Sequence, residues 1–391
     1  MYLQRLELKN FRNYSSLEFN PQPGLNILWG ANAQGKTNLL EALYLLAASK
    51  SFRVKSEREL IKWGAESAEI EAQLARADGQ EENLTMRWAR NPLTKGWERR
   101  LCHQGQTVKK LGEFLKVLPL TLFVPGDLAL IQGAPLYRRR LLDVLLCKLS
   151  PSYYLALTRY QESLRQRNKL LHKLALKVES PQPLSASQRQ ILEVWDLQFC
   201  EWGAKVLAER LRVLRELGRV VNEVYNFLAQ SEGPRLELRY RGSLSRELLT
   251  ASEVEEVALE AGLRQALEAS LKRDLSLRST QVGPHRDDFA IEAQGHNLRL
   301  FGSQGQHRSL SLALRLAEAQ VMAQVRQEAP LLLLDDSFSE LDPERSRLLL
   351  RYLLPWGQVF VTTAFPPRFF KELPAGQYYR VQAGEIERID F

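Results

Sequence analysis

A glycine-rich segment near the N-terminus has the residue types and spacing of a phosphate-binding loop. Residues 30–37 read GANAQGKT and fit the pattern G-x-x-x-x-G-K-[ST]. The backbone N–H groups of such a loop surround phosphate oxygens, and the helix that follows adds partial positive charge. Lys36 is expected to reach the β and γ phosphates of ATP, and Thr37 to supply a hydroxyl ligand to Mg²⁺. The predicted binding residues are Gly30, Ala31, Asn32, Ala33, Gln34, Gly35, Lys36, Thr37 and Asn38.

Two adjacent aspartates near the other end of the chain form a second candidate group. Residues 329–336 read APLLLLDD, the pattern of a buried strand that carries carboxylates to its C-terminal edge, where ligands of α/β proteins bind. Asp335 is expected to be a Mg²⁺ ligand together with Thr37. The side chain of Asp336 is expected on the opposite face of the pleat, where it would polarise the attacking water. Asp336 and Lys36 are the predicted catalytic residues, although two acids after a strand are also typical of a turn with a helix N-cap.

The elements around these residues predict an α/β head that is interrupted by helices. Before residue 90, AEIEAQLARA and ENLTMRWA predict a hairpin, and TNLLEALYLLAAS from Thr37 has helical spacing. Further on, DDFAIEA and NLRLFG predict another hairpin, APLLLLDD and GQVFVTT predict buried strands, and SLSLALRLAEAQVMA predicts a helix. The predicted head comprises residues 1–140 together with 272–391, and the inserted helical lobe comprises residues 141–271.

The inserted lobe contains two apolar stripes with helical spacing. The second runs from Trp195 to Phe227, and the segment ESPQPLSASQ (179–188) predicts the turn between the two helices. Either a short antiparallel coiled coil or two ordinary core helices fits this pattern. At about 1.5 Å of rise per residue, the arm would span only some 40 to 50 Å. The first stripe is interrupted at Arg167 and consists of Tyr153, Leu157, Tyr160, Leu164, Leu171 and Leu174.

Residues 301–309 (FGSQGQHRS) open a predicted helix and resemble the signature motif of ABC-type ATPases. The candidate binding residues are Ser303, Gly305 and Gln306, because the helix N-terminus and the backbone of Gly305 form an anion site. In ABC-type proteins the signature of one subunit closes on ATP held by the other, so the resemblance implies an ATP-dependent homodimer. The alternative is an ordinary capped helix start.

Three further positions fit the same class of ATPase. Residues 339–342 (SELD) stand at the place of the D-loop, which meets its counterpart across such a dimer. Thr362 and Thr363 end the next predicted strand, where many transporter ATPases have a switch histidine, and a threonine hydroxyl there can hydrogen-bond a γ-phosphate. Asp336 stands where many related ATPases carry Glu, which implies slow hydrolysis of the kind that suits a switch.

Motifs along nearly the whole chain resemble the RecF family. They are KNFRNY (9–14), GANAQGKTN (30–38), KSFR (50–53), PGDLALIQGAP (125–135) followed by RRRLLD, QRNKLL (166–171), VGPHRDD (282–288), SQGQHRS and LLLLDDSFSELD. The resemblance implies an α/β P-loop NTPase of ABC/SMC type with a split head and a helical second lobe. It also places VGPHRDD near the nucleotide or the dimer interface, without assigning it chemistry.

The same resemblance implies a function. ATP and Mg²⁺ would be the cofactors, ATP would drive dimerisation on DNA, and a weak DNA-dependent ATPase would act as a switch. The partners would be single-stranded, gapped or junction DNA and the RecO and RecR mediators. The expected roles are recombinational gap repair, support of replication and SOS induction.

The charge of the chain is compatible with a nucleic-acid partner. The formal net charge is +8 and the pI is about 9.3, which favours a polyanion such as nucleic acid or an anionic membrane surface. Contacts to DNA phosphates would be mostly independent of base sequence and sensitive to salt. The candidate clusters are Arg138–Arg140 and Arg165–Lys173, although a solvated helix face is the more ordinary explanation of each.

Other classes of protein fit the sequence less well. No run approaches the length of about 20 apolar residues that a membrane helix needs, and no secretory signal precedes the chain, so a cytoplasmic location without a membrane partner is expected. Transporter nucleotide-binding subunits usually have only a small helical insertion, chromosome-organising SMC proteins need arms of hundreds of residues, and a nuclease would need another acidic site. The cysteines show no CxxC spacing, which favours a reduced compartment and no zinc; they are Cys102, Cys147 and Cys200.

Overall fold

The computed structural model describes residues 1–91, 93–94, 96–176, 184–230, 234–253, 255–338, 341, 343–365 and 376–389. The chain divides into two compact units. Unit 1 contains Met1–Leu128, Glu223–Gly233 and Gln304–Phe391, and unit 2 contains Ala129–Asn222 and Pro234–Ser303. These bounds differ from the expected ones, because residues 129–140 and 272–303 belong to unit 2 and residues 223–233 belong to unit 1.

Unit 1 contains a six-stranded, mostly parallel sheet in the order β15-β14-β3-β13-β12-β8. Neighbouring strands from β8 to β14 pair in parallel, and β15 is antiparallel to β14. The runs LLLLD and QVFVTT are buried at every position, as expected for parallel strands that are covered on both faces. The strands are β3 (Gly24–Trp29), β8 (Leu120–Phe123), β12 (Leu331–Asp335), β13 (Gln358–Thr363), β14 (Gln377–Gln382) and β15 (Glu385–Ile389).

A second, antiparallel sheet of unit 1 has the order β2-β1-β4-β5-β6-β7. The predicted hairpin is confirmed, because β4 and β5 pair in antiparallel register from Ser67 opposite Ala89 to Ala75 opposite Glu81. Buried and less buried residues alternate along β4, so one face of this strand lies on the core. The strands are β1 (Tyr2–Phe11), β2 (Tyr14–Phe19), β4 (Ser67–Ala75), β5 (Glu81–Arg90), β6 (Trp97–His103) and β7 (Gln106–Thr107).

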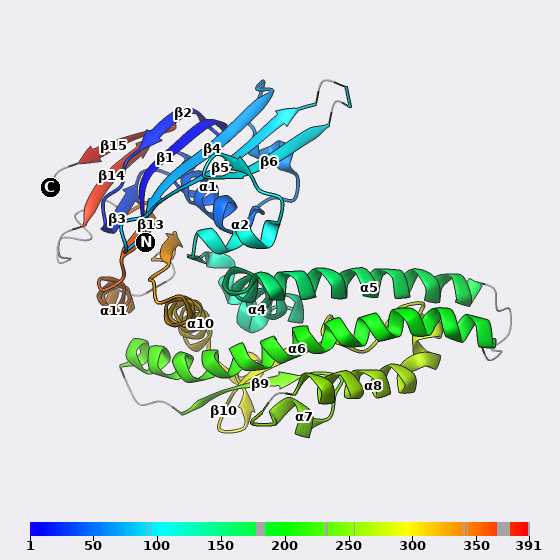
Figure 1. Cartoon of the computed structure of the whole chain (residues 1–391). Coiled ribbons are helices and arrows are strands. Elements are labelled where there is room, and N and C mark those ends of the chain that lie inside the picture. The colour runs from blue at the N-terminus through cyan, green and yellow to red at the C-terminus, as the bar shows by residue number, and fades with distance from the viewer. Residues whose placement is uncertain are drawn as a thin grey trace. The chain divides into compact units, whose positions relative to one another are not determined.

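Helix α1 (Lys36–Ala48) lies between these two sheets (Figure 1). It contacts β4 and β5 of the antiparallel sheet and β8, β12 and β13 of the parallel one. Ten of its 13 residues are buried, so its apolar residues surround the helix instead of forming a single stripe. One hydrophobic core therefore includes α1 and both sheets, from Leu6 and Ile70 to Leu331 and Phe360.

The other helices of unit 1 surround this core. An ion pair joins two of them: the guanidinium of Arg315 on α10 donates to Asp127 Oδ1 at 2.6 Å and to Glu318 Oε2 at 2.7 Å. Asp127 Oδ2 also accepts from the backbone N–H of Val124, so α10 is attached to the exit of strand β8. The bounds are η1 (Glu57–Leu60), α2 (Leu111–Val117), η2 (Pro125–Leu128), α10 (Gln304–Arg326) and α11 (Pro343–Leu353).

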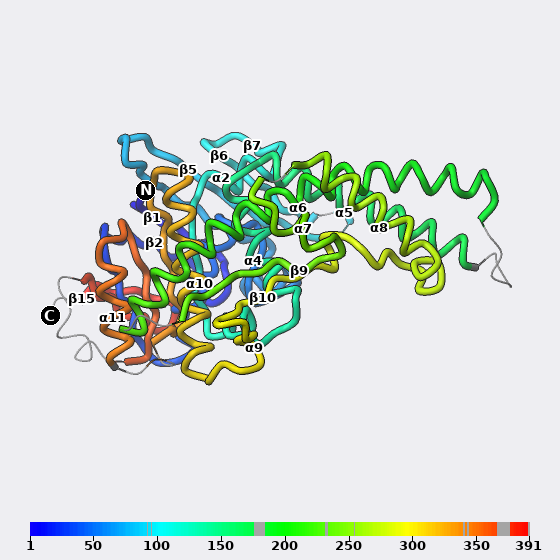
Figure 2. The backbone as a smooth tube through the Cα atoms, turned by 90° about the horizontal axis from the view of Figure 1, so that it is seen from below, coloured from blue at the N-terminus to red at the C-terminus, as the bar shows by residue number. Residues whose placement is uncertain are grey.

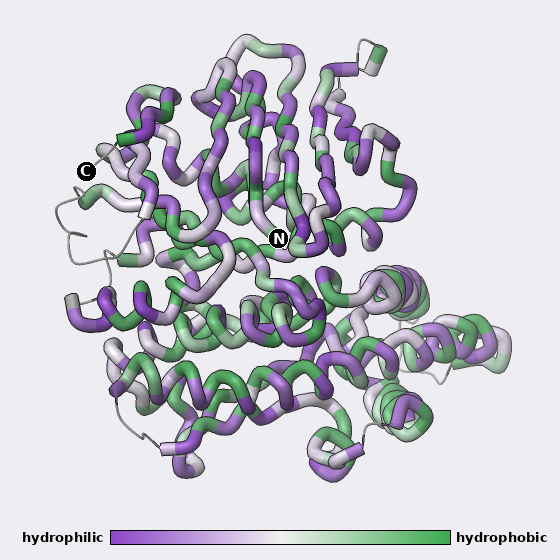
Figure 3. Tube along the Cα trace, turned by 60° about the vertical axis from the view of Figure 1, so that its left-hand side comes forward, coloured by the Kyte–Doolittle hydropathy of each residue, from purple (hydrophilic) through white to green (hydrophobic). Residues whose placement is uncertain are grey.

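Unit 2 is mainly helical, and α5, α6 and α8 run side by side (Figures 1 and 2). Contacts of α5 with α6 join Leu171 to Leu192, Arg167 to Asp196 and Tyr160 to Phe199, so the two helices are antiparallel. Hydrophilic and hydrophobic residues alternate around these helices (Figure 3), as amphipathic packing requires. The helices are α3 (Ala129–Gln132), α4 (Pro135–Leu149), α5 (Pro151–Leu176), α6 (Ala186–Ala229), α7 (Arg246–Thr250), α8 (Glu256–Leu277) and α9 (Leu298–Phe301). The last residues of α6, from Glu223, belong to unit 1.

The small sheet of unit 2 corrects one prediction. Its order is β11-β10-β9, with β9 (Leu236–Arg241), β10 (Asp288–Ala293) and β11 (His296–Asn297). The segment NLRLFG was expected to be a full strand, but only Asn297 pairs with β10 and the rest forms α9. The reason is local, since the side chain of Asn297 accepts from the N–H of Arg299 and caps the helix.

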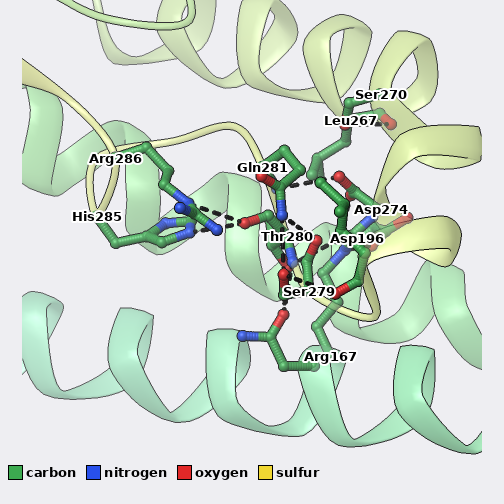
Figure 4. A network of polar contacts seen from close by, with 12 residues as sticks. Arg167, Asp196, Leu267, Ser270, Asp274, Ser279, Thr280, Gln281, His285 and Arg286 are labelled. Atoms are coloured by element: carbon green, nitrogen blue, oxygen red, sulfur yellow. Dashed lines mark hydrogen bonds and ion pairs between the residues drawn. The ribbon is translucent and has the colours of Figure 1, made fainter.

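The break in the first apolar stripe is a buried ionic contact. Arg167 is fully buried, and its guanidinium donates to Asp274 Oδ2 and Asp196 Oδ1, each at 2.6 Å (Figure 4). It also donates to the hydroxyl of Thr280 at 2.8 Å. Asp274 is equally buried, so each charge has its partner inside the unit. Arg167 therefore replaces an apolar core residue by joining α5, α6 and α8.

Two further expectations concern the turn of the inserted lobe and membrane-spanning helices. Of the predicted turn 179–188, residues 179–183 lie outside the described residues. Within the part of the chain that is described, no helix is both long and apolar enough to cross a membrane.

Breaking the buried contact is expected to destabilise the protein. Arg167→Met leaves Asp274 buried without its cation, so we expect the free energy of unfolding to fall by about 3–5 kcal/mol. Urea unfolding followed by circular dichroism measures the change. Arg159→Met on the exposed face of the same helix is the control and is expected to have no measurable effect. Equal stability of both variants would contradict a structural role for this contact.

Candidate nucleotide-binding site

The predicted phosphate-binding loop lies between β3 and α1, at the C-terminal edge of the parallel sheet. Its two glycines stand where side chains do not fit. A Cβ at Gly30 would lie 2.3 Å from the carbonyl oxygen of Val381. Gly35 has φ 119° and a Cβ there would lie 2.7 Å from the hydroxyl of Tyr14. The neighbouring strands thus enforce the glycine spacing of the motif.

Lys36 begins α1 and folds back over the loop. Its ammonium donates to the carbonyl oxygens of Gly30 at 2.7 Å and Ala31 at 2.8 Å. Burial lowers the pKa of Lys36, and the nearby carboxylates of Asp336 and Asp335 oppose that shift. The cation is thus held at the mouth of the loop, where a phosphate would take the place of the carbonyl contacts.

Asp335 ends β12, and its carboxylate accepts hydrogen bonds from two hydroxyl groups. Thr37 Oγ1 donates to Asp335 Oδ1 at 2.7 Å, and Thr362 Oγ1 on β13 donates to the same oxygen at 2.8 Å. The side chain is mostly buried, and burial raises the pKa of Asp335 while the two hydroxyl hydrogen bonds lower it. The predicted metal ligands Thr37 and Asp335 are thus in direct contact.

These residues line a cavity of about 300 Å³. It is rich in polar groups, and both aspartates and Lys36 face it. The predicted residues that line it are Asn32, Ala33, Gly35, Lys36, Thr37, Asn38, Asp335, Asp336 and Thr362. Gly30 and Ala31 contribute the carbonyl oxygens that hold Lys36. Gln34 is used elsewhere, since its Oε1 accepts from the backbone N–H of Ala383 at 2.7 Å.

Comparison with known proteins shows which family the chain belongs to. The family model of the RecF/RecN/SMC N-terminal domain matches residues 2–384. A DNA replication and repair protein RecF from Bacillus cereus (strain G9842) is 36% identical over 364 residues, which cover 93% of this chain and 92% of that protein. The chain belongs to the RecF family. A RecF of Bacillus thuringiensis (strain Al Hakam) has the same identity and coverage.

Solved structures agree with the family and the fold. A structure of the recombination mediator protein RecF with ATP in the RecFOR pathway has a TM-score of 0.86 and 30% identity, covering 100% of this chain and 98% of that one. An Smc head domain from Pyrococcus furiosus, bound to a domain of ScpA, has a TM-score of 0.55 at 18% identity, with 100% of this chain and 96% of that one covered. The second likeness shows the fold alone. Together with the family model and the RecF structure, it confirms the predicted ABC/SMC-type fold.

Asp336 departs from the expected geometry in this member of the RecF family. The pleat of β12 was expected to turn its side chain to the opposite face from Asp335. Instead β12 ends at Asp335, and Asp336 has a left-handed backbone with φ 47°. Alternation stops with the strand, so both aspartates line the same cavity. The backbone N–H of Asp336 donates to Thr362 Oγ1 at 3.0 Å.

The two threonines at the end of β13 have different partners. The hydroxyl of Thr362 donates to Asp335 and accepts from Asp336, so its only proton is directed at a carboxylate instead of at a phosphate. Thr363 Oγ1 accepts from the backbone N–H of Phe365 at 3.0 Å and does not line the cavity. Thr362 is therefore a positioning residue for the aspartates.

The signature residues do not join this cavity. Ser303 and Gly305 stand at the start of α10, and the side chain of Gln306 hydrogen-bonds the hydroxyl of Tyr225. None of the three lines the cavity within the described part of the chain. The predicted D-loop, 339–342, lies outside the described residues except for Leu341.

The motif VGPHRDD lies inside unit 2. His285 donates from Nε2 to the carbonyl of Thr280 (Figure 4). At Nδ1 it accepts from the hydroxyl of Tyr160, and the two bonds together need a neutral ring. Burial lowers the pKa of His285 to about 4. Arg210 donates to the carbonyl of Pro284, and Asp287 accepts from the N–H of Ser243. These contacts give the motif a packing role within the helical unit.

One cavity residue was missed by sequence reasoning. Arg53 lines the cavity, donates to Asn38 Oδ1 at 2.7 Å and lies 3.5 Å from the buried carboxylate of Glu41. Glu41 in turn receives two hydrogen bonds from Arg12. Arg12 belongs to the family motif KNFRNY and Arg53 to KSFR. These motifs contain the two arginines but do not indicate that both lie beside the loop.

Removing the hydroxyl of Thr362 tests its positioning role. Thr362→Val takes one donor from the buried carboxylate of Asp335, and a lost hydrogen bond to a charged group costs about 1.5–3 kcal/mol. We expect the Kd of ATP with Mg²⁺ to rise about tenfold or more, and less without Mg²⁺. Isothermal titration measures both constants. Thr363→Val, equally buried on the same strand, is the matched control; an identical effect of the two substitutions would refute the assignment.

Proposed function

We propose that this protein is an ATP-switched DNA-binding protein of replication and recombinational repair. The observation that carries the proposal is the convergence of Lys36, Thr37 and Asp335 on one cavity. This convergence supports a site for a nucleoside triphosphate and a divalent cation. Family membership adds the RecF relatives, whose name assigns them to DNA replication and repair, and a RecF structure with ATP.

The residues present fit Mg²⁺. The Thr37 hydroxyl and the Asp335 carboxylate are hard oxygen donors in contact with each other. No group of three or more His, Cys, Asp or Glu side chains forms a metal site among the described residues. This agrees with a cation that takes few protein ligands and completes its shell with phosphate oxygens and water. When bound, Mg²⁺ would neutralise charge on the β and γ phosphates.

The two aspartates have separate proposed roles. Asp335 is held by two hydroxyl groups and serves the cation. The carboxylate of Asp336 faces the same cavity and is the candidate base that takes a proton from the attacking water. Lys36, which lines the same cavity, would stabilise phosphate charge. An aspartate as the base, shorter than the glutamate of many related ATPases, supports slow hydrolysis. ATP would then act as a switch.

The signature residues support an ATP-dependent homodimer. Ser303, Gly305 and Gln306 do not line the chain's own cavity, which is what we expect if the start of α10 meets ATP held by a second copy. ATP would then close two copies on single-stranded, gapped or junction DNA. RecO and RecR are the proposed partners in gap repair, with support of replication and SOS induction as the outcome.

Substitution of the phosphate-contacting lysine tests the switch. Lys36→Met removes the cation but keeps an unbranched side chain, so we expect loss of ATP binding, of ATP-dependent dimerisation and of ATP-stimulated DNA binding. DNA binding is measured without nucleotide, with ATP and with ADP at two salt concentrations, and mass by light scattering. If the parent protein binds ATP but ignores DNA, the proposed function fails and a switch that acts only on proteins takes its place.

Asp336→Asn tests the assignment of the base. The amide cannot accept the proton, so we expect ATP to bind normally while hydrolysis slows by about 10²-fold or more. Phosphate release and ATP affinity are measured on the same preparation. Asp335→Asn is the contrasting variant and is expected to weaken binding of ATP with Mg²⁺. Unchanged hydrolysis by Asp336→Asn would remove Asp336 from the mechanism.

A further inference from the structure

A basic hollow lies on the outer face of helix α5 in unit 2. It has a volume of about 650 Å³ and is open to solvent, and none of the described residues that line it is acidic. We call it the α5 basic surface and define it by its cationic members and one histidine, Arg165, Lys169, His172, Lys173 and Arg278.

The helix geometry places these side chains in a row. Arg165, Lys169 and Lys173 follow one another at intervals of four residues, which corresponds to about 6 Å of axial rise per step. His172 extends the same face, and all four side chains are exposed. The inward face of this segment holds Arg167 and Leu171, both fully buried. The cations are thus a continuous outer row instead of a scattered cluster.

Among the described residues, three of the four cations on this surface have no ion pair, whereas some other exposed arginines of unit 2 have one. Arg212 pairs with Glu209, and Arg264 pairs with Glu260, each within one helix turn. On the α5 basic surface only Arg165 has such a pair, with Glu162. No ion pair joins Lys169, Lys173 or Arg278 to an acidic residue in the part of the chain that is described. Lys169 interacts with Glu162 through its charge but forms no ion pair with it, so none of these three cations is held in contact with a carboxylate among the described residues.

Arg278 reaches the surface from a second element. It is the C-cap of α8 and has a left-handed backbone with φ 55°, a position at which glycine is the usual residue. This backbone conformation is unfavourable for an arginine. The turn that contains it brings a fifth basic side chain beside α5. The surface is thus assembled from two helices and not from one charged run.

We propose that the α5 basic surface binds the phosphate backbone of DNA. Rows of Lys and Arg recognise phosphates through charge and carry no base information. The only ring among the described lining residues is the imidazole of His172, so the stacking platforms that grip unpaired bases are not present there. The surface therefore binds without sequence preference. This inference rests on the proposed function and names the part of unit 2 that carries it out.

The second basic cluster of the sequence, Arg138–Arg140, differs from the α5 basic surface because most of it is not exposed. Arg138 of Arg138–Arg140 is 3% exposed and donates to both oxygens of Asp288, and Arg139 donates to the carbonyl of Asp287. Those two arginines hold unit 2 together. Only Arg140 of that cluster is exposed, so it does not form a comparable row.

Neutralising the row tests the proposal in the full-length protein. The variant combines Arg165→Gln, Lys169→Gln and Lys173→Gln. Each lost phosphate contact lowers the slope of log K against log salt by about 0.9 on duplex DNA, so three contacts reduce it by about 2–3. DNA affinity is measured with ATP present at several salt concentrations. The matched control, which removes the same number of charges from paired arginines, combines Arg212→Gln, Arg219→Gln and Arg264→Gln.

The outcomes separate this inference from the proposed function. A reduced slope in the first variant alone, with ATP affinity and thermal stability unchanged, supports the α5 basic surface. If the parent binds DNA and both variants keep its slope, the surface does not contact DNA, and an acidic protein partner becomes the alternative. If the two variants lose the same slope, only net charge matters and the inference fails. A parent protein that does not bind DNA at all overturns the proposed function itself.

Discussion

The carboxylate of Asp335 is buried at the edge of the parallel sheet, and a charge in such a place is tolerated only when it is hydrogen-bonded. Its two donors are Thr37, from the start of α1, and Thr362, from the end of β13. Thr362 also accepts from the backbone of Asp336. The phosphate loop, the aspartates and the end of β13 are thus joined through two oxygen atoms, Asp335 Oδ1 and Thr362 Oγ1. These contacts hold the carboxylate of Asp335 beside Thr37, the residue that follows Lys36.

This constraint explains why the ATPase fold has to be assembled from both ends of the chain. Strand β3, which leads into the loop, lies between β13 and β14, and β12 lies between β13 and β8. The helix that follows the loop is buried on all sides because one sheet lies on each face of it. Neither end of the sequence therefore has a complete core without the other. Closing the core is the same event as bringing Asp335 to Thr37.

Much of the site could be predicted from the sequence, because a phosphate loop and an apolar strand with terminal acids are local patterns. What failed depends on contacts between distant residues or on where an element ends. The orientation of Asp336 follows from the end of β12 one residue earlier, and the role of Thr362 follows from pairing in register with Asp335. The helix after Asn297 is set by a side-chain cap that competes with strand alternation. Arg53 needed the fold to bring it beside Asn38.

The arginines of α5 show how a buried contact determines an exposed surface. Arg165 and Arg167 are two positions apart, which is about 200° around a helix, so they occupy opposite faces. Leucine contacts along the inner stripe have no fixed direction, whereas the guanidinium of Arg167 must meet Asp274 and Asp196 in defined geometry. That requirement fixes the rotation of α5 about its own axis. It therefore also fixes the outward direction of Arg165, Lys169 and Lys173. The buried position of Arg167 thus explains both the interruption of the apolar stripe and the row of exposed cations.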